Sequence, residues 1–180
     1  MAKDFDPHRL DVRRFAEAGA VLETGEALAR YPRLLAETQG ADQARQVRWQ
    51  ARGELLDPQH HQPQVWVHLE AQTNLPLLCQ RCLAPVDVPL EVTRAFRFVA
   101  DEATAAAEDD ASEEDLLALS RNFDLVELVE DELLMELPVA PRHEVCPEPV
   151  KMSVADAAFE EAGAEKEHPF ALLGRLKTGK

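Results

Sequence analysis

The stretch Leu78-Cys79-Gln80-Arg81-Cys82-Leu83 separates two runs of residues that each have the pattern of a β-strand. Apolar and polar side chains alternate from Val65 to Ala71 before it and from Val86 to Val99 after it, which is the period of a strand with one buried face. A short connection between two such runs predicts a hairpin. We expect a tight turn in which the two cysteine sulfurs point to one side.

A third strand is predicted upstream of this hairpin, from Ala44 to Leu56. Its apolar side chains occupy alternate positions and its polar side chains the positions between them. The segment 57–63, which contains two prolines, predicts the turn to the next strand. Three neighbouring strands with short connections predict an antiparallel meander.

The strongest helix pattern in the chain runs from Asp124 to Leu137 and ends at Pro138. Asp124 is the expected N-cap residue, with Glu127 three residues later as in a capping box. The predicted fold class is therefore α+β, a twisted antiparallel sheet with a few packed helices and a candidate structural zinc knuckle at the hairpin.

The length of 180 residues predicts a single domain over 1–180. Within it we expect an N-terminal part of helices and a short strand, a sheet core, an acidic disordered loop, and a helix followed by an extended C-terminal segment. These parts cover residues 1–43, 44–100, 101–115 and 116–180 respectively. The loop is expected because it carries eight acidic residues and no basic one.

The three cysteines and one histidine fall into two pairs with ligand-like spacing, Cys79 with Cys82 and His143 with Cys146. Three thiolates and an imidazole are a standard ligand set for structural Zn²⁺. Roughly 60 residues separate the pairs, so no regular zinc motif is matched. Two alternatives remain open from the sequence: ordinary buried thiols without a metal, and a redox-active pair, which would need a strand-to-helix junction.

The formal net charge of −15 disfavours a protein that coats nucleic acid through phosphate contacts over its whole surface. Without the segment 101–115 the net charge is −7, so a local basic surface is compatible with the rest of the chain. No apolar run is long enough to span a membrane, and the N-terminus lacks the apolar region of a secretory signal. With an odd number of cysteines, these features predict a cytoplasmic protein.

A basic face of the sheet is the candidate RNA-binding surface. Arg48 and Arg52 share one side of their strand, and we expect Arg81 to lie beside Arg94 and Arg97 of the following strand. Arginines and aromatic side chains on a sheet are one way in which single-stranded RNA is bound. The alternative is an ordinary polar sheet face.

Four motifs in order resemble the bacterial YceD family, whose members are described as large ribosomal RNA subunit accumulation proteins. These are Cys79-Gln80-Arg81-Cys82-Leu83, the acidic helix from Leu125 to Leu134, the sequel from Leu137 to His143, and the terminal segment from Pro169 to Lys177. The resemblance implies a cytoplasmic, non-enzymatic factor needed for normal levels of 23S rRNA, through its synthesis, its processing or assembly of the large subunit.

Two hypotheses for the partner follow. The chain binds 23S rRNA, its precursor or a pre-ribosomal particle, or its acidic surface holds a basic large-subunit ribosomal protein. A nuclease that uses the carboxylates between Glu127 and Glu136 is a third alternative, which the absence of recognisable catalytic motifs disfavours. We expect neither a membrane partner nor a small-molecule substrate, and no cofactor other than structural Zn²⁺.

Overall fold

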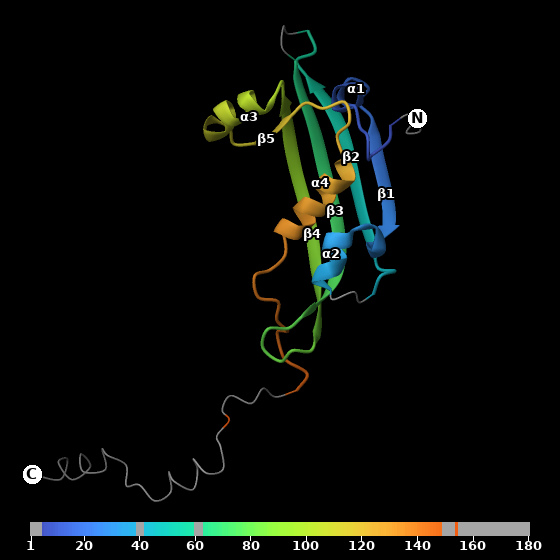
Figure 1. Cartoon of the computed structure of the whole chain (residues 1–180), viewed down its shortest axis with the longest axis vertical. Coiled ribbons are helices and arrows are strands. Elements are labelled where there is room, and N and C mark those ends of the chain that lie inside the picture. The colour runs from blue at the N-terminus through green and yellow to red at the C-terminus, as the bar shows by residue number, and fades with distance from the viewer. Residues whose placement is uncertain (1–4, 39–41, 60–62, 149–153, 155–180) are drawn as a thin grey trace, which may run out of the picture. The chain divides into compact units, whose positions relative to one another are not determined.

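The computed structural model describes residues 5–38, 42–59, 63–148 and 154. Its centre is a five-stranded open sheet with the strands in the order of the sequence (Figure 1). The first four strands pair in antiparallel fashion, and the fifth pairs parallel to the fourth. The strands are β1 (Val21–Ala27), β2 (Gln46–Leu56), β3 (Gln64–Leu78), β4 (Pro85–Val99) and β5 (Asp115–Ala118).

The helices of the described residues are short, and they complete the predicted α+β class. They are α1 (Val12–Glu17), α2 (Pro32–Glu37), α3 (Glu102–Glu108) and α4 (Leu125–Met135), with the 3₁₀ turns η1 (Leu28–Arg30) and η2 (Asp109–Ala111). All these elements lie in the first of two compact units, Met1–Val145. In the second unit, Cys146–Lys180, the structure describes 146–148 and 154. The predicted C-terminal amphipathic segment lies outside the described residues.

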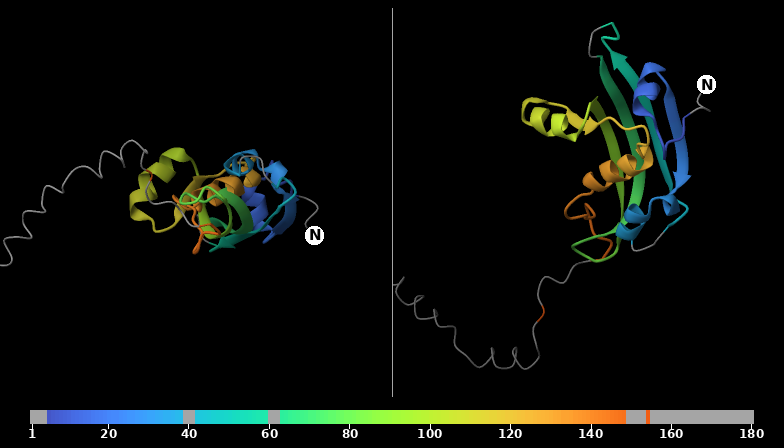
Figure 2. Two further views of the ribbon diagram at one scale, coloured as in Figure 1. Left: turned by 90° about the horizontal axis from the view of Figure 1, so that it is seen from below. Right: turned by 45° about the horizontal axis from the view of Figure 1, so that its top comes forward.

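The hydrophobic core lies on one face of the sheet, as the alternating pattern predicted. Along β3, residues Val65, Val67, Leu69 and Ala71 are buried, while the residues between them are exposed or half-buried. Helices α2 and α4 lie across this face (Figure 1), and the strands twist and curve beneath them (Figure 2). The opposite face carries the polar half of the alternation and remains exposed on β2.

A buried carboxylate joins α2 to α4. Glu130 of α4 accepts hydrogen bonds from the backbone N–H groups of Arg33, at 2.8 Å, and Leu34, at 3.1 Å. Its second oxygen lies 3.0 Å from the Arg33 guanidinium. Because a buried carboxylate is tolerated where it is paired and hydrogen-bonded, Glu130 has a structural explanation. It therefore adds no support to the nuclease alternative.

The segment 101–115 differs from the expectation of a disordered loop, because it contains α3 and η2. Asp101 caps α3 by accepting a hydrogen bond from the backbone N–H of Thr104. The guanidinium of Arg97 lies 2.9 Å from the Glu108 carboxylate and 3.0 Å from that of Glu114. These ion pairs hold the acidic segment at the end of β4, where it leads into β5.

Candidate metal centre

The hairpin between β3 and β4 forms the tight turn that the cysteine spacing predicted. The backbone N–H of Cys79 donates to the carbonyl of Ala84 at 3.0 Å, and that of Leu83 donates to the carbonyl of Cys79 at 2.9 Å. Leu83 has a left-handed backbone with φ of 59°. This geometry turns the chain sharply enough that the Cys79 and Cys82 side chains lie near each other.

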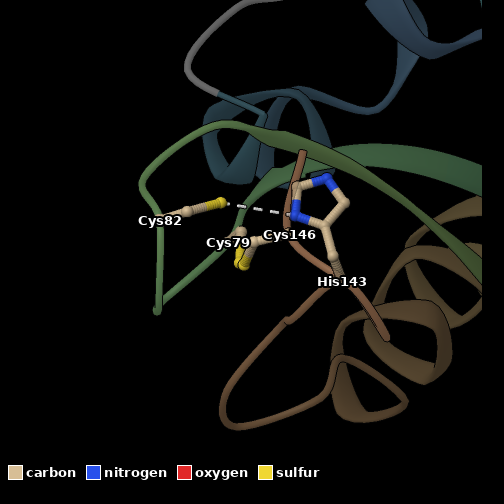
Figure 3. A group of neighbouring side chains, drawn as sticks. All are labelled: Cys79, Cys82, His143 and Cys146. Carbon is tan, nitrogen blue, oxygen red and sulfur yellow. Dashed lines mark hydrogen bonds between the residues drawn. The ribbon is translucent and has the colours of Figure 1, made fainter. Parts of the chain in front are cut away.

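The segment after α4 brings the second pair of residues to this turn. The ligand atoms of Cys79, Cys82, His143 and Cys146 all lie within 4.8 Å of one another (Figure 3). Zinc–ligand bonds of about 2.1 Å to nitrogen and about 2.3 Å to sulfur place tetrahedral S and N ligands about 3.5 Å apart. The Cys82 sulfur lies 3.4 Å from Nδ1 of His143, which fits this geometry. The group could therefore hold a metal ion.

The hydrogen bonding of His143 determines which ring nitrogen is available to a metal. Its Nε2 lies 3.0 Å from the carbonyl oxygen of Pro85. A carbonyl oxygen only accepts, so Nε2 must carry the proton and donate. In the neutral ring Nδ1 then keeps its lone pair, and Nδ1 is the atom that faces the Cys82 sulfur. Metal-binding histidines are commonly oriented by such a bond from the other nitrogen to a carbonyl.

Further hydrogen bonds fasten the segment of His143 to the turn independently of any metal. The backbone N–H of Gln80 donates to the carbonyl of Pro141 at 2.8 Å. The Arg81 guanidinium donates to the carbonyls of His143 and Glu144, at 2.7 and 3.3 Å. Arg81, predicted as an RNA-binding residue, therefore also links the two halves of the candidate metal centre.

The surroundings of Cys79 favour its thiolate form. Burial raises the pKa of the Cys79 thiol, but hydrogen bonds from the backbone N–H groups of Cys82, His143 and Arg81 outweigh that effect and lower the pKa to about 5. Metals bind the thiolate, and N–H donors directed at the sulfur stabilise it. The turn thus favours the state of Cys79 that a metal requires.

The turn is a poor match to the redox alternative. Cys79 and Cys82 lie in a hairpin rather than at the junction of a strand with a helix. A thioredoxin-like pair needs that junction. Four protein side chains would fill a tetrahedral site and leave no position for a substrate or a catalytic water.

The structure does not bring the five candidate RNA-binding arginines together. Arg94 and Arg97 are three residues apart on β4, so they point to opposite faces of the sheet. Arg94 lies 3.5 Å from the buried Glu132 of α4, and Arg97 holds the acidic segment. Arg97 is 12 residues from Pro85 at the turn, which corresponds to about 40 Å along a strand.

Arg48 and Arg52 share the polar face of β2, as predicted. Arg48 lines a shallow cavity of about 400 Å³ that also contains Gln50, Gln72 and Thr93. Arg52 is half exposed and lies 3.6 Å from the Glu54 carboxylate. These two arginines are the candidates that remain accessible on one surface.

A second arginine cluster was not predicted from the sequence. Arg13 and Arg14 of α1 and Arg121, near the start of α4, line one cavity of about 440 Å³. The sequence signal is weak, because more than 100 residues separate Arg14 from Arg121. The pairing of Leu10 with Phe123, which places them together, has no sequence signature.

A family model described as "Large ribosomal RNA subunit accumulation protein YceD" matches residues 67–177. The chain belongs to the YceD family. A protein of that name from Haemophilus influenzae is 34% identical over 110 residues, which cover 60% of this chain and 63% of the relative. The chain thus matches less than two thirds of that relative, and no solved structure matches it.

The match to the YceD family contains the candidate metal centre, since it includes the turn at Cys79 and the segment of His143. It begins after α1 and β2, so Arg13, Arg48 and Arg52 lie outside it. Among the described residues, no helix has the length and apolar character needed to cross a membrane. The family name associates the chain with accumulation of large-subunit ribosomal RNA.

Proposed function

We propose that this chain is a cytoplasmic, non-enzymatic factor that promotes accumulation of 23S rRNA by binding the RNA, its precursor or a pre-ribosomal particle. The observation that carries the proposal is the family match over 67–177. A relative bears the name of a large ribosomal RNA subunit accumulation protein, and the molecule offers an exposed polar sheet face with which to bind a partner.

Arginines and aromatic rings on one side of this face support the proposal. Arg48 and Arg52 project from β2, while Trp66 and His68 lie on the same face of β3 with their rings nearly parallel and their centroids 6.3 Å apart. Aromatic rings stack on bases and arginines contact phosphates. The ring of His68 also lies 2.7 Å from the Glu54 carboxylate, which orients it on this surface.

Ultraviolet crosslinking in cells, followed by sequencing of the bound RNA, tests this proposal. We expect enrichment of large-subunit rRNA or its precursor over small-subunit rRNA. Substituting Arg48→Glu together with Arg52→Glu should reduce the crosslinks severalfold. Arg30→Glu with Arg142→Glu is the charge-matched control, since both residues are exposed and neither belongs to the sheet. Equal recovery of both ribosomal RNAs would contradict the proposal.

A second candidate function is the holding of a basic large-subunit ribosomal protein. The observation that favours it is the presence of Glu23, Glu70 and Glu91 on the same polar face as Arg48. If crosslinked material contains a ribosomal protein and no RNA, and the Arg48→Glu/Arg52→Glu variant retains it, this second function replaces the first.

We propose further that the ion of the candidate metal centre is Zn²⁺ and that its role is structural. Three thiolates and one imidazole match zinc in structural sites. Such an ion would join the segment of His143 to the hairpin of β3 and β4 and contribute to folding. Elemental analysis of protein purified without a metal-affinity tag should find about one zinc per chain, and Cys82→Ser should lose it. Fresh, reduced wild-type protein without zinc would contradict this assignment.

A further inference from the structure

Three arginines line one cavity of the molecule, although the chain as a whole carries a net charge of −15. Its volume is about 440 Å³. It lies between α1 and the stretch that leads from β5 to α4. Its lining residues are Asp11, Arg13, Arg14, Leu119, Ser120 and Arg121.

The backbone fixes the two walls of this cavity against each other. Leu10 and Phe123 form an antiparallel bridge in which each N–H donates to the carbonyl of the other, at 2.8 and 3.0 Å. The N–H of Val12 donates to the carbonyl of Ser120 at 3.2 Å. Leu10 and Val12 are fully buried. Arg13, Arg14 and Arg121 are exposed, and the backbone that carries them is held in place by these hydrogen bonds.

Several arginines elsewhere in the molecule are held in ion pairs. Arg33, Arg45 and Arg97 each lie within 3.0 Å of a carboxylate. Within the described residues, the guanidinium groups of Arg13, Arg14 and Arg121 form no ion pair. Asp11, the one carboxylate in the cavity wall, accepts a hydrogen bond from the backbone N–H of Arg14 as the N-cap of α1. The positive charge of the cluster is thus available to an external anion.

We propose that the cavity of Arg13, Arg14 and Arg121 binds the phosphate groups of single-stranded RNA. The inference rests on the proposed function and names a contact surface on α1 that is separate from the sheet face of Arg48. Guanidinium groups bind phosphate oxygens through paired, charge-assisted hydrogen bonds. Acidic side chains elsewhere repel a polyanion, so three arginines with a single carboxylate among them direct the RNA backbone to this cavity.

The experiment measures the affinity of full-length protein for a fluorescein-labelled single-stranded RNA oligonucleotide at several salt concentrations. Arg13→Ala with Arg121→Ala is compared with the control Arg30→Ala with Arg142→Ala, which removes the same charge from exposed arginines elsewhere. Each phosphate contact contributes about 0.7 to the slope of log affinity against log salt. The site variant should lower the slope by about 1.4 and the affinity about tenfold at 0.15 M salt, whereas the control should change both little. Circular dichroism confirms that all variants fold.

Three results would overturn the inference. They are failure of the wild type to bind the oligonucleotide, an equal loss of affinity in the site variant and the control, and equal binding of a poly-glutamate peptide to the same site. The failure of the proposed function is a separate result. If cellular crosslinks lack large-subunit rRNA but the oligonucleotide binds through Arg13 and Arg121, the inference stands and the proposed function is wrong.

Discussion

Leu83 is the residue at which the turn of the candidate metal centre is strained. Its φ of 59° lies in the left-handed region, and its side chain is 67% exposed. That conformation costs a residue with a side chain about 1–2 kcal/mol, while glycine adopts it freely. Glycine also makes the unfolded chain more flexible, which costs the folded state about 0.5–1 kcal/mol. Because the exposed Leu83 side chain buries little surface, the relief of backbone strain exceeds this cost.

We therefore expect Leu83→Gly to raise the free energy of unfolding by about 0.5–1 kcal/mol. Leu83→Val is the matched comparison and should lower it, because a β-branched side chain tolerates the left-handed region poorly. Urea titration at a fixed zinc concentration measures both. A loss of stability in the glycine variant would show that Leu83 has a packing role that its exposure does not reveal.

Glu132 is a buried carboxylate that the fold tolerates at a cost. It is 6% exposed, and burial raises its pKa above the ordinary value of 4.5, although Arg94 opposes the shift. The folded state thus holds a proton on Glu132 more tightly than the unfolded state. This group's contribution to stability is therefore most favourable below pH 4.5 and is lost as the pH rises through the folded pKa.

Glu132→Gln should accordingly raise the melting temperature at pH 7, and its advantage over wild type should shrink as the pH falls toward 4. Melting curves of both proteins between pH 4 and pH 8 test this sign. Glu127→Gln on the exposed side of α4 is the control and should change little. A glutamine variant that is less stable at pH 7 would mean that the ion pair with Arg94 outweighs the burial of the charge.

The docking of α1 on β2 depends on a single glycine. A Cβ atom on Gly53 would lie 2.7 Å from the carbonyl oxygen of Phe15, a backbone atom whose displacement would also move α1. Gly25 of β1 is also in a strand, but a Cβ there would lie 3.6 Å from its nearest neighbour. The two positions differ in packing while sharing the same secondary structure.

Gly53→Ala should therefore lower the free energy of unfolding by about 1–3 kcal/mol, the usual cost of an overpacked core. Gly25→Ala should leave it unchanged or raise it slightly, because glycine weakens a strand interior. Thermal denaturation of the two variants tests the comparison. Equal stability of both variants would indicate that α1 can shift away from β2 without loss.

Secondary-structure elements were predictable where local pattern alone decides them. Alternation along 44–56 and 86–99 gave β2 and β4, and Asp124 caps α4 as expected by accepting from the N–H groups of Val126 and Glu127. Helix α3 was not predictable in this way. Its segment has the composition of a loop, and it is held by ion pairs with Arg97, which belongs to β4. The run of charges predicted a solvated loop, but the ion pairs with Arg97 hold the segment in an ordered, helical form.

At the scale of the whole molecule, the sequence does not show which distant residues come together. The spacing identified Cys79, Cys82, His143 and Cys146 as ligand-like residues, but the two pairs approach only because α4 runs back along the sheet toward the hairpin of β3 and β4 (Figure 1). The cluster of Arg13 and Arg121 depends in the same way on one isolated bridge. The sequence shows each half of these sites, but only the fold joins the two halves.

The candidate metal centre and the arginine cavity are separated by most of the length of the sheet. Phe15 of α1 contacts β2 at Gly53, which pairs with Val67 of β3. Val67 is 11 residues from Leu78 at the turn, or about 35 Å along the strand. The buried core extends continuously between these positions. A change confined to the turn therefore leaves α1 and its packing in place.

This separation predicts that metal loss and RNA binding can be uncoupled. Cys82→Ser should lose zinc and lower the melting temperature, because the segment of His143 is no longer joined to the hairpin through the ion. The same variant should bind the RNA oligonucleotide within about twofold of wild type, since Arg13, Arg14 and Arg121 are held by backbone bonds far from the turn. Arg13→Ala/Arg121→Ala should show the reverse, with full zinc and weak RNA binding. If Cys82→Ser abolishes RNA binding while circular dichroism shows an intact sheet, the RNA contacts lie at the metal-bearing turn, where Arg81 becomes the leading contact residue.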